Sequence, residues 1–180
     1  MEVNRRGFLA AAAAAVAAPA PERNGLPPPG TDRERLFRRC TACQACVAAC
    51  PEGVLVAALG EYGLKGVMMP RQSFVHGFCR PECTVCGAVC PTGAIRPFRV
   101  EDKSKLTGGL AVVAPAECLV TREKLTCGNC AAHCPHKAIA LKAKESVPPT
   151  VDAAKCVGCG ACEYHCPSKA IRVRPRAKMD

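Results

Sequence analysis

The apolar positions of this chain follow a pattern that occurs four times. In each copy a Cys-Pro dipeptide is followed by two residues and then by a small or branched residue with a branched one after it. These pairs open short strand-like runs such as 139–141 and 171–173. Four copies of a loop, a Cys-Pro turn and a short strand predict an α+β fold built from repeated units. The four pairs are Val54-Leu55, Ala94-Ile95, Ala138-Ile139 and Ala170-Ile171.

The first twenty residues have a different pattern. Arg5 and Arg6 precede an alanine-rich apolar stretch, and small residues follow it at 15–20, which is the order of an export signal. The arginine pair followed by Phe8 and Leu9 resembles the twin-arginine signal. The stretch of about eleven mostly alanine residues is short for a membrane span. We therefore assign residues 1–20 to a twin-arginine signal segment and expect a periplasmic protein, which an uncleaved signal would tether to the cytoplasmic membrane. A frayed helix with a chance arginine pair is the alternative.

Proline and charge mark the expected boundaries. Residues 21–30 are rich in proline and are typical of an extended tether, so the folded part should begin near Thr31. The charged stretch from Arg99 to Gly109 separates a first unit, 31–108, from a second, 109–180. Residues 142–150 indicate a turn inside the second unit, and residues 54–64 a short helix.

Cysteine is the most unusual part of the composition, at 16 of 180 residues. The chain has no Trp, two Tyr and five Phe, so its hydrophobic core should be thin. Such a cysteine content indicates a disulfide scaffold or a metal protein. The first cysteines of four quartets recur at spacings of 39, 39 and 38 residues. The quartets are Cys40, Cys43, Cys46, Cys50; Cys79, Cys83, Cys86, Cys90; Cys118, Cys127, Cys130, Cys134; and Cys156, Cys159, Cys162, Cys166.

The spacing within the quartets predicts iron–sulfur clusters. The first and fourth quartets have three cysteines at two-residue gaps, then three residues, a fourth cysteine and proline, the bacterial [4Fe–4S] run. Glycines such as Gly158 and Gly160 would let the backbone approach the cluster closely. The other two quartets lengthen only their first gap, so we expect clusters of different potential there. Disulfides do not explain four copies of one spacing, and zinc sites usually show separated cysteine pairs. All sixteen cysteines are therefore predicted to hold four [4Fe–4S] clusters.

The pairing of the quartets is less directly given. In two-cluster ferredoxins the fourth cysteine of each run ligates the other cluster. Four self-contained sites, or a nested pairing of quartet one with four and two with three, are the alternatives. We favour sequential pairing, because the Gly108-Gly109 break separates quartets two and three. The expected sets are Cys40, Cys43, Cys46 with Cys90; Cys79, Cys83, Cys86 with Cys50; Cys118, Cys127, Cys130 with Cys166; and Cys156, Cys159, Cys162 with Cys134.

Other functions receive little support. The net charge of +10 would suit a nucleic-acid partner. However, each oxidised cluster with four thiolates carries about −2, which nearly cancels that charge, and the basic residues are dispersed. We find no haem motif, phosphate loop or nucleophile–base pair, and therefore expect no catalytic centre. The remaining polar candidates are expected beside the clusters, at the surface or in packing: His76, His133, His136, His165, Tyr62 and Tyr164.

Four Cys-Pro quartets behind a twin-arginine signal resemble the periplasmic ferredoxin-type proteins of nitrate reduction and methylamine utilisation, the NapG/MauM type. The long gap between Cys118 and Cys127 is similar to that type. The resemblance implies two tandem bacterial-ferredoxin-like dicluster modules in an electron carrier. It also implies two redox partners, a membrane-bound quinol-oxidising iron–sulfur protein and an exported reductase or similar acceptor. The alternative is the iron–sulfur subunit of a larger, for example molybdenum-dependent, oxidoreductase, and a third is a zinc-stabilised interaction module. The regular period favours the relay.

Overall fold

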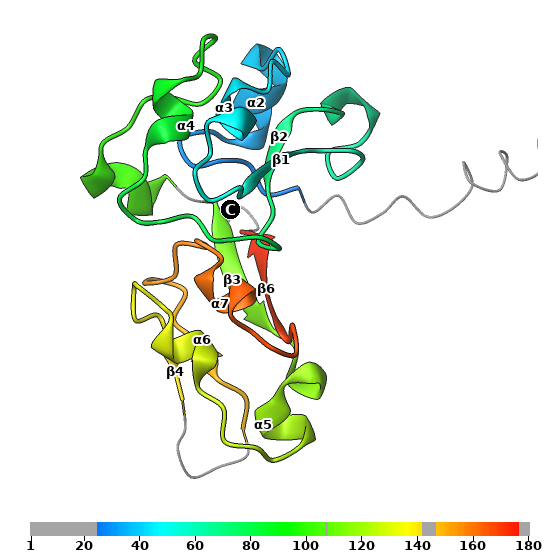
Figure 1. The fold of residues 1–180 in the computed structure, drawn as a ribbon, viewed down its shortest axis with the longest axis vertical. Helices are drawn as coiled ribbons and strands as arrows, with labels where there is room; N and C mark the ends of the chain where they lie inside the picture. Colours follow the sequence, from blue (N-terminus) through cyan, green and yellow to red (C-terminus); the bar gives the residue numbers. More distant parts are fainter. Residues whose placement is uncertain (1–24, 107, 142–146, 177–180) are drawn as a thin grey trace, which may run out of the picture.

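The computed structural model describes residues 25–106, 108–141 and 147–176. Figure 1 shows two halves along the long axis, the first formed by residues 25–106 and the second by residues 108–141 and 147–176. The predicted export signal, the start of the predicted tether and most of the predicted turn at 142–150 lie outside the described residues.

Helix α2 (Arg33–Arg39) opens the helical part of the first half. Its N-cap is Asp32, whose carboxylate accepts the backbone N–H of Arg35 at 2.7 Å. Arginines occupy the last turn, where they complement the helix dipole. Leu36 is completely buried and anchors the helix on the core.

Each quartet carries its third cysteine on one short helical turn that ends before the Cys-Pro dipeptide. Proline has no backbone N–H and cannot continue the helical hydrogen bonding, so the turns stay short. The four turns are α3 (Ala45–Ala48), α4 (Val85–Ala88), α6 (Asn129–Ala132) and α7 (Ala161–Tyr164).

The Cys-Pro turn has the same geometry in all four copies. The third residue after the final cysteine donates its backbone N–H to that cysteine's carbonyl, at 3.1 to 3.3 Å. All four of these residues have positive φ, between 48° and 60°. The apolar pairs that follow are at most 9% exposed, which confirms the repeat as a structural unit. The four turn residues are Gly53, Gly93, Lys137 and Lys169.

Three antiparallel strand pairs follow or precede these turns. The longest joins the start and the end of the second half, with Val113 opposite Ile171 and Gly109 opposite Pro175. The predicted strand-like runs at 139–141 and 171–173 are confirmed as strands over Ile139–Ala140 and Ile171–Pro175. The prediction is wrong for the second copy, where Ala94-Ile95 is buried but forms no strand. The pairs are β1 (Leu55–Ala57) with β2 (Pro70–Gln72), β3 (Gly109–Val113) with β6 (Ile171–Pro175), and β4 (Ile139–Ala140) with β5 (Thr150–Val151).

The helix expected over residues 54–64 is wrong. That stretch begins with β1, and a helical turn appears only at η1 (Leu64–Gly66). The physical reason is tertiary, because Leu55 lies opposite Gln72 in the β1–β2 pair and is buried there.

The tether expected at 21–30 is also wrong where the structure describes it, from Gly25 onward. Leu26 is 3% exposed, and Pro28 and Pro29 are among the most fully buried residues. Proline has no backbone N–H, so this segment forms hydrogen bonds to the rest of the fold through its carbonyl groups. The backbone N–H of Gln72 donates to the carbonyl of Leu26 at 2.8 Å, and the Gln72 side chain donates to that of Pro27 at 2.7 Å. The apolar proline rings and the hydrogen-bonded carbonyls therefore allow this segment to pack against β2 as part of the folded structure.

Two further segments differ from simple linkers. The long gap of the third quartet contains α5 (Leu119–Arg122), preceded by η3 (Pro115–Glu117). The charged stretch between the halves forms η2 (Val100–Lys105), in which Lys103 is buried.

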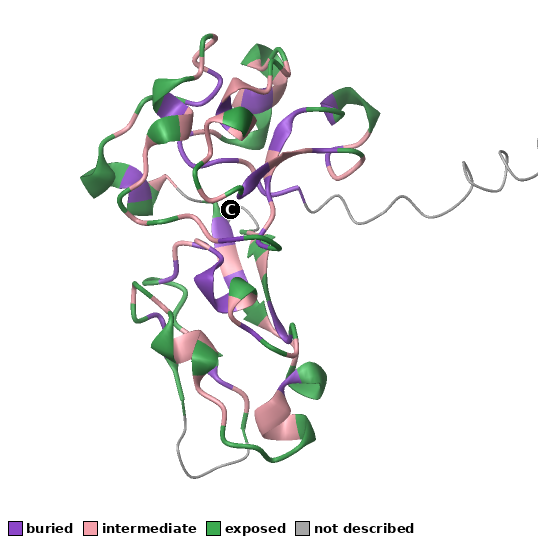
Figure 2. Cartoon of the chain, in the orientation of Figure 1, coloured by how far each residue is buried: buried purple, intermediate pink, exposed green. Residues whose placement is uncertain are grey.

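The buried residues form several small clusters instead of one large core, as the scattered purple segments of Figure 2 show. One of these clusters joins the two halves, because Leu26, Val54 and Phe74 pack against Val173 of β6. Within the described ranges, no helix combines the length and hydropathy that a membrane crossing requires.

The contact between Gly160 and Phe74 gives a test of this junction. Gly160 has φ +85°, and a Cβ there would lie 2.0 Å from Cδ1 of Phe74. Gly53 also has a positive φ, +60°, but a Cβ there would meet nothing within 4 Å. Both Gly→Ala changes incur a left-handed backbone penalty of about 1–2 kcal/mol. We predict that Gly160→Ala lowers the free energy of unfolding by about 1–3 kcal/mol more than Gly53→Ala does, because the added methyl group overpacks the junction. Thermal unfolding followed by circular dichroism measures the difference, and equal Tm values would contradict this packing.

Candidate metal centres

Four thiols from two quartets meet in the first half. They line one cavity between α2, α3 and the Cys-Pro turn of the second quartet. Three come from the first quartet, and the fourth is the last cysteine of the second quartet. Leu36 and Ile95 form apolar walls of the same cavity. The four are Cys40, Cys43, Cys46 and Cys90.

The second half repeats this arrangement. A second cavity is lined by three thiols of the third quartet and by the last cysteine of the fourth. Its first thiol, Cys118, is buried at the start of α5 although the gap that follows it is long. The four are Cys118, Cys127, Cys130 and Cys166.

The remaining thiols are also neighbours across quartets. Cys50 lies close enough to Cys79 to contribute to its raised pKa, together with Cys83 and after the dominant effect of burial. In the second half, Cys134 contributes in the same way to the raised pKa values of Cys159 and Cys162. The structure thus brings the last cysteine of each quartet beside the thiols of its neighbour.

The ligand loops of the first and fourth quartets share one backbone conformation. The second and fourth residues after the first cysteine have positive φ in both loops. In the fourth quartet these are Gly158 and Gly160, at 69° and 85°, and neither has room for a Cβ. In the first quartet Ala42 and Gln44 adopt the same conformation, at 53° and 64°. The space beside these two glycines is taken by Gly109 and Phe74, and close approach of their backbone to a cluster stays a prediction.

Backbone N–H groups point at several of the sulfur atoms. Such hydrogen bonds orient metal-ligating thiolates and stabilise their negative charge. The last cysteine of a quartet accepts from the apolar pair that follows it in two copies. The bonds are Ile95 N–H to Cys90 Sγ at 3.3 Å, Ala138 N–H to Cys134 Sγ at 3.3 Å, Ala42 N–H to Cys40 Sγ at 3.4 Å and Ala111 N–H to Cys156 Sγ at 3.5 Å.

Burial makes several of these thiols reluctant to ionise without a metal. Burial first, and neighbouring thiols second, raise the pKa of Cys46 to about 11 and that of Cys86 to about 12. The pKa of Cys90 is lowered, because hydrogen bonds from Ile95 and Thr92 outweigh its burial. Since metal ligands must be thiolates, loading these sites releases protons.

The donor set fits an iron–sulfur cluster. All sixteen cysteines are free of disulfides, and two of the groups place four sulfur donors around one cavity. Within the described ranges, no three His, Cys, Asp or Glu side chains are gathered tightly enough to hold a single metal ion. Thiolate donors favour iron–sulfur clusters among other soft centres. A [4Fe–4S] cluster would be held by the thiols of each group and would supply one-electron redox chemistry.

The two halves meet beside two of the thiols. The backbone N–H of Cys79 donates to the carbonyl of Cys159 at 2.9 Å. A small cavity at this contact is lined by both residues, by His136 and by Lys103. Neither this contact nor Lys103 follows from the cysteine pattern, because both depend on how the halves pack.

The other polar candidates lie around these groups. His133 and His165 stack with ring centroids 3.8 Å apart, and burial together with His133 lowers the pKa of His165. His76 is exposed. Tyr62 packs as expected, 2% exposed with its hydroxyl donating to the carbonyl of Pro70 at 3.3 Å. Tyr164 is partly exposed and contacts the ring of His165.

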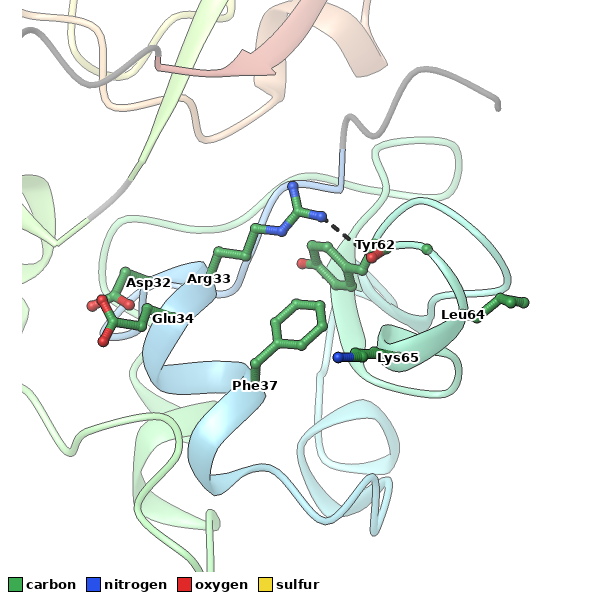
Figure 3. Close-up of a pocket in the computed structure, with 8 residues that line it drawn as sticks. Asp32, Arg33, Glu34, Phe37, Tyr62, Leu64 and Lys65 are labelled. Atoms are coloured by element: carbon green, nitrogen blue, oxygen red, sulfur yellow. Dashed lines mark hydrogen bonds between the residues drawn. The ribbon is translucent and has the colours of Figure 1, made fainter. Parts of the chain in front are cut away.

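A hollow on the first half contains no cysteine (Figure 3). Its guanidinium, on Arg33, donates to the carbonyl of Tyr62 at 3.2 Å and lies 5.6 Å from the Phe37 ring centroid. The hollow is lined by Asp32, Arg33, Glu34, Phe37, Tyr62, Gly63, Leu64 and Lys65.

Comparison with known proteins agrees with this chemistry. A 4Fe-4S dicluster domain matches residues 125–170. The methylamine utilization ferredoxin-type protein MauM of Methylobacillus flagellatus is 35% identical over 150 residues, covering 78% of this chain and 63% of the relative. MauM of Paracoccus denitrificans is 32% identical over 168 residues, covering 84% and 70%. The ferredoxin-type protein NapG of Escherichia coli is 31% identical over 147 residues, covering 74% and 62%.

This chain therefore spans somewhat less than two thirds of the MauM protein of Methylobacillus flagellatus, at 63% of its length. The identity nevertheless extends over most of the chain. With sulfur donors gathered in cavities and a dicluster domain in its second half, the chain belongs to the MauM and NapG family of ferredoxin-type iron–sulfur electron-transfer proteins.

Proposed function

We propose that this chain carries four [4Fe–4S] clusters and relays single electrons between two partner proteins, without catalysing a reaction itself. The observation that carries the proposal is the gathering of thiols from two quartets around one cavity in each half. Clusters 1 to 4 are named here for the quartet that supplies three of their ligands.

Sequential pairing is the ligand arrangement that we propose. Self-contained quartets would keep Cys90 with Cys79, Cys83 and Cys86, whereas Cys90 lines the cavity of the first quartet. Nesting would pair quartets from different halves, whereas Cys166 lines the cavity of the third quartet. These contacts support two tandem dicluster modules, 31–108 and 109–180, with residues 25–30 packed onto the first.

The proposed ligand sets are then the following. Cluster 1 takes Cys40, Cys43, Cys46 and Cys90; cluster 2 takes Cys79, Cys83, Cys86 and Cys50; cluster 3 takes Cys118, Cys127, Cys130 and Cys166; cluster 4 takes Cys156, Cys159, Cys162 and Cys134.

The contacts between these sets suggest a path. Cys46 of cluster 1 is close enough to Cys86 of cluster 2 to contribute to its raised pKa. The ligand segments of clusters 2 and 4 are in contact where the backbone N–H of Cys79 donates to the carbonyl of Cys159. Clusters 4 and 3 share one buried group, in which Cys156 and Cys118 both lie. We therefore propose that electrons pass through clusters 1, 2, 4 and 3 in that order, or in reverse.

The ends of this path are the natural contact points for partners. Cys43 of cluster 1 is exposed, so a partner could approach that cluster closely. By the resemblance to NapG and MauM, we propose a membrane-bound quinol-oxidising iron–sulfur protein as one partner and an exported reductase or similar acceptor as the other. The alternative, a subunit of a larger oxidoreductase complex, would use the same clusters with a catalytic chain bound at one end.

Iron analysis tests the cluster count. Four clusters predict a brown protein with about sixteen iron atoms per chain when the full chain is purified without oxygen. A protein with stoichiometric zinc and little iron would contradict the proposal. About eight iron atoms per chain would contradict the count of four clusters and would indicate two clusters, as in a single dicluster module.

We also propose that the protein is exported to the periplasm by the twin-arginine route. Arg5 and Arg6 lie outside the described residues, so this proposal rests on the sequence. Arg5→Lys with Arg6→Lys should abolish periplasmic accumulation and leave the iron content of the retained protein unchanged. Arg38→Lys with Arg39→Lys, an arginine pair in α2, is the matched control and should be exported normally. Equal periplasmic amounts of both variants in cell fractionation would show that another route is used.

A further inference from the structure

Lys103 is a buried lysine in the charged stretch at the end of the first module. It lies in η2 and is only 5% exposed, although its neighbours along the chain are mostly exposed. Burying an ammonium group is costly unless hydrogen bonds and a negative charge compensate it. A negative charge near Lys103 is therefore expected to compensate its buried ammonium group.

The hydrogen-bond partners of Lys103 are neutral and belong to one loop. Its Nζ donates to the carbonyl of Cys83 at 2.6 Å and also to the carbonyl of Arg80. This loop connects the first two cysteines of cluster 2. None of the ion pairs found between described residues involves Lys103. Lys103 and Cys79, a proposed ligand of cluster 2, line the same small cavity.

We propose that Lys103 is the counter-charge of cluster 2 and stabilises its reduced form. The inference rests on the proposed cluster function. On reduction, the cluster accepts one electron from a neighbouring cluster, which is oxidised by one electron, and no bond forms or breaks. The charge of cluster and thiolates changes from about −2 to about −3. A buried cation beside it favours the more negative state and so raises the reduction potential.

The second module offers a contrast at the segment that ends at the first cysteine of cluster 4. Arg176 follows the last strand there and donates to the carbonyls of Cys156 and Ala153 beside cluster 4. Arg176 is exposed, so water screens its charge far more than that of Lys103. Lys103 and Cys79 also line the cavity where clusters 2 and 4 meet. Lys103 therefore biases an electron at this junction toward cluster 2, on the side of the first module.

The test is a redox titration of the full iron-loaded chain, followed by electron paramagnetic resonance. Lys103→Met and Lys103→Gln remove the charge, and Lys103→Arg keeps it. Lys105→Met is the matched control, because Lys105 is two residues away with a side chain 78% exposed. We expect one cluster in both neutral variants to fall in potential by at least about 59 mV, which is a tenfold change in a one-electron equilibrium. Lys103→Arg and Lys105→Met should stay near the wild-type value.

The outcomes separate this inference from the proposed function. A wild-type chain without four clusters would contradict the proposed function itself. Unchanged potentials in iron-loaded Lys103→Met and Lys103→Gln would overturn only the role of Lys103. An equal fall in Lys103→Arg would also overturn it, since packing and not charge would then be responsible. Loss of one cluster from both neutral variants, with Lys103→Arg fully loaded, would support the role of the charge, and loss from all three would overturn it.

Discussion

The arrangement on which the rest of the structure depends is the exchange of the last cysteine between neighbouring quartets. Each quartet folds as a loop, a helical turn and a Cys-Pro turn, and its last thiol then lies beside the other quartet of the same half. The exchange explains why the Cys-Pro turn keeps one geometry in four copies, including left-handed lysines at Lys137 and Lys169. In each half, the turn places one such thiol and the apolar pair after it along the same cavity, Cys90 with Ile95 and Cys166 with Ile171.

The same arrangement compensates for a thin core. The buried residues form small clusters, and many of them contain cysteines, such as Cys46 and Cys162. In such small modules, metal binding supplies folding free energy that apolar burial does not. The protons that burial keeps on the thiols must leave as the clusters form. On this account, assembly of the clusters and completion of the fold are one process.

Much of the fold could be predicted from the sequence, because the cysteine spacing and the apolar pairs are local patterns. These local patterns predict the Cys-Pro turns and the strands that begin at Ile139 and Ile171. The errors arose where distant contacts decide the structure. Pro28 and Pro29 pack although their composition is typical of a tether, and Leu55 joins a strand because Gln72 lies opposite it. Lys103 could not be distinguished from the exposed lysines around it, since its burial depends on the loop after Cys79.

The central claim is that every cluster takes three ligands from one quartet and one from its neighbour in the same module. Anomalous diffraction at the iron absorption edge, from crystals of the iron-loaded full chain, tests it most directly. The account predicts four iron sites in the order 1, 2, 4 and 3, with Cys90 on the site of Cys40 and Cys166 on the site of Cys118. Iron sites ligated by a single quartet, or by quartets from different modules, would contradict it.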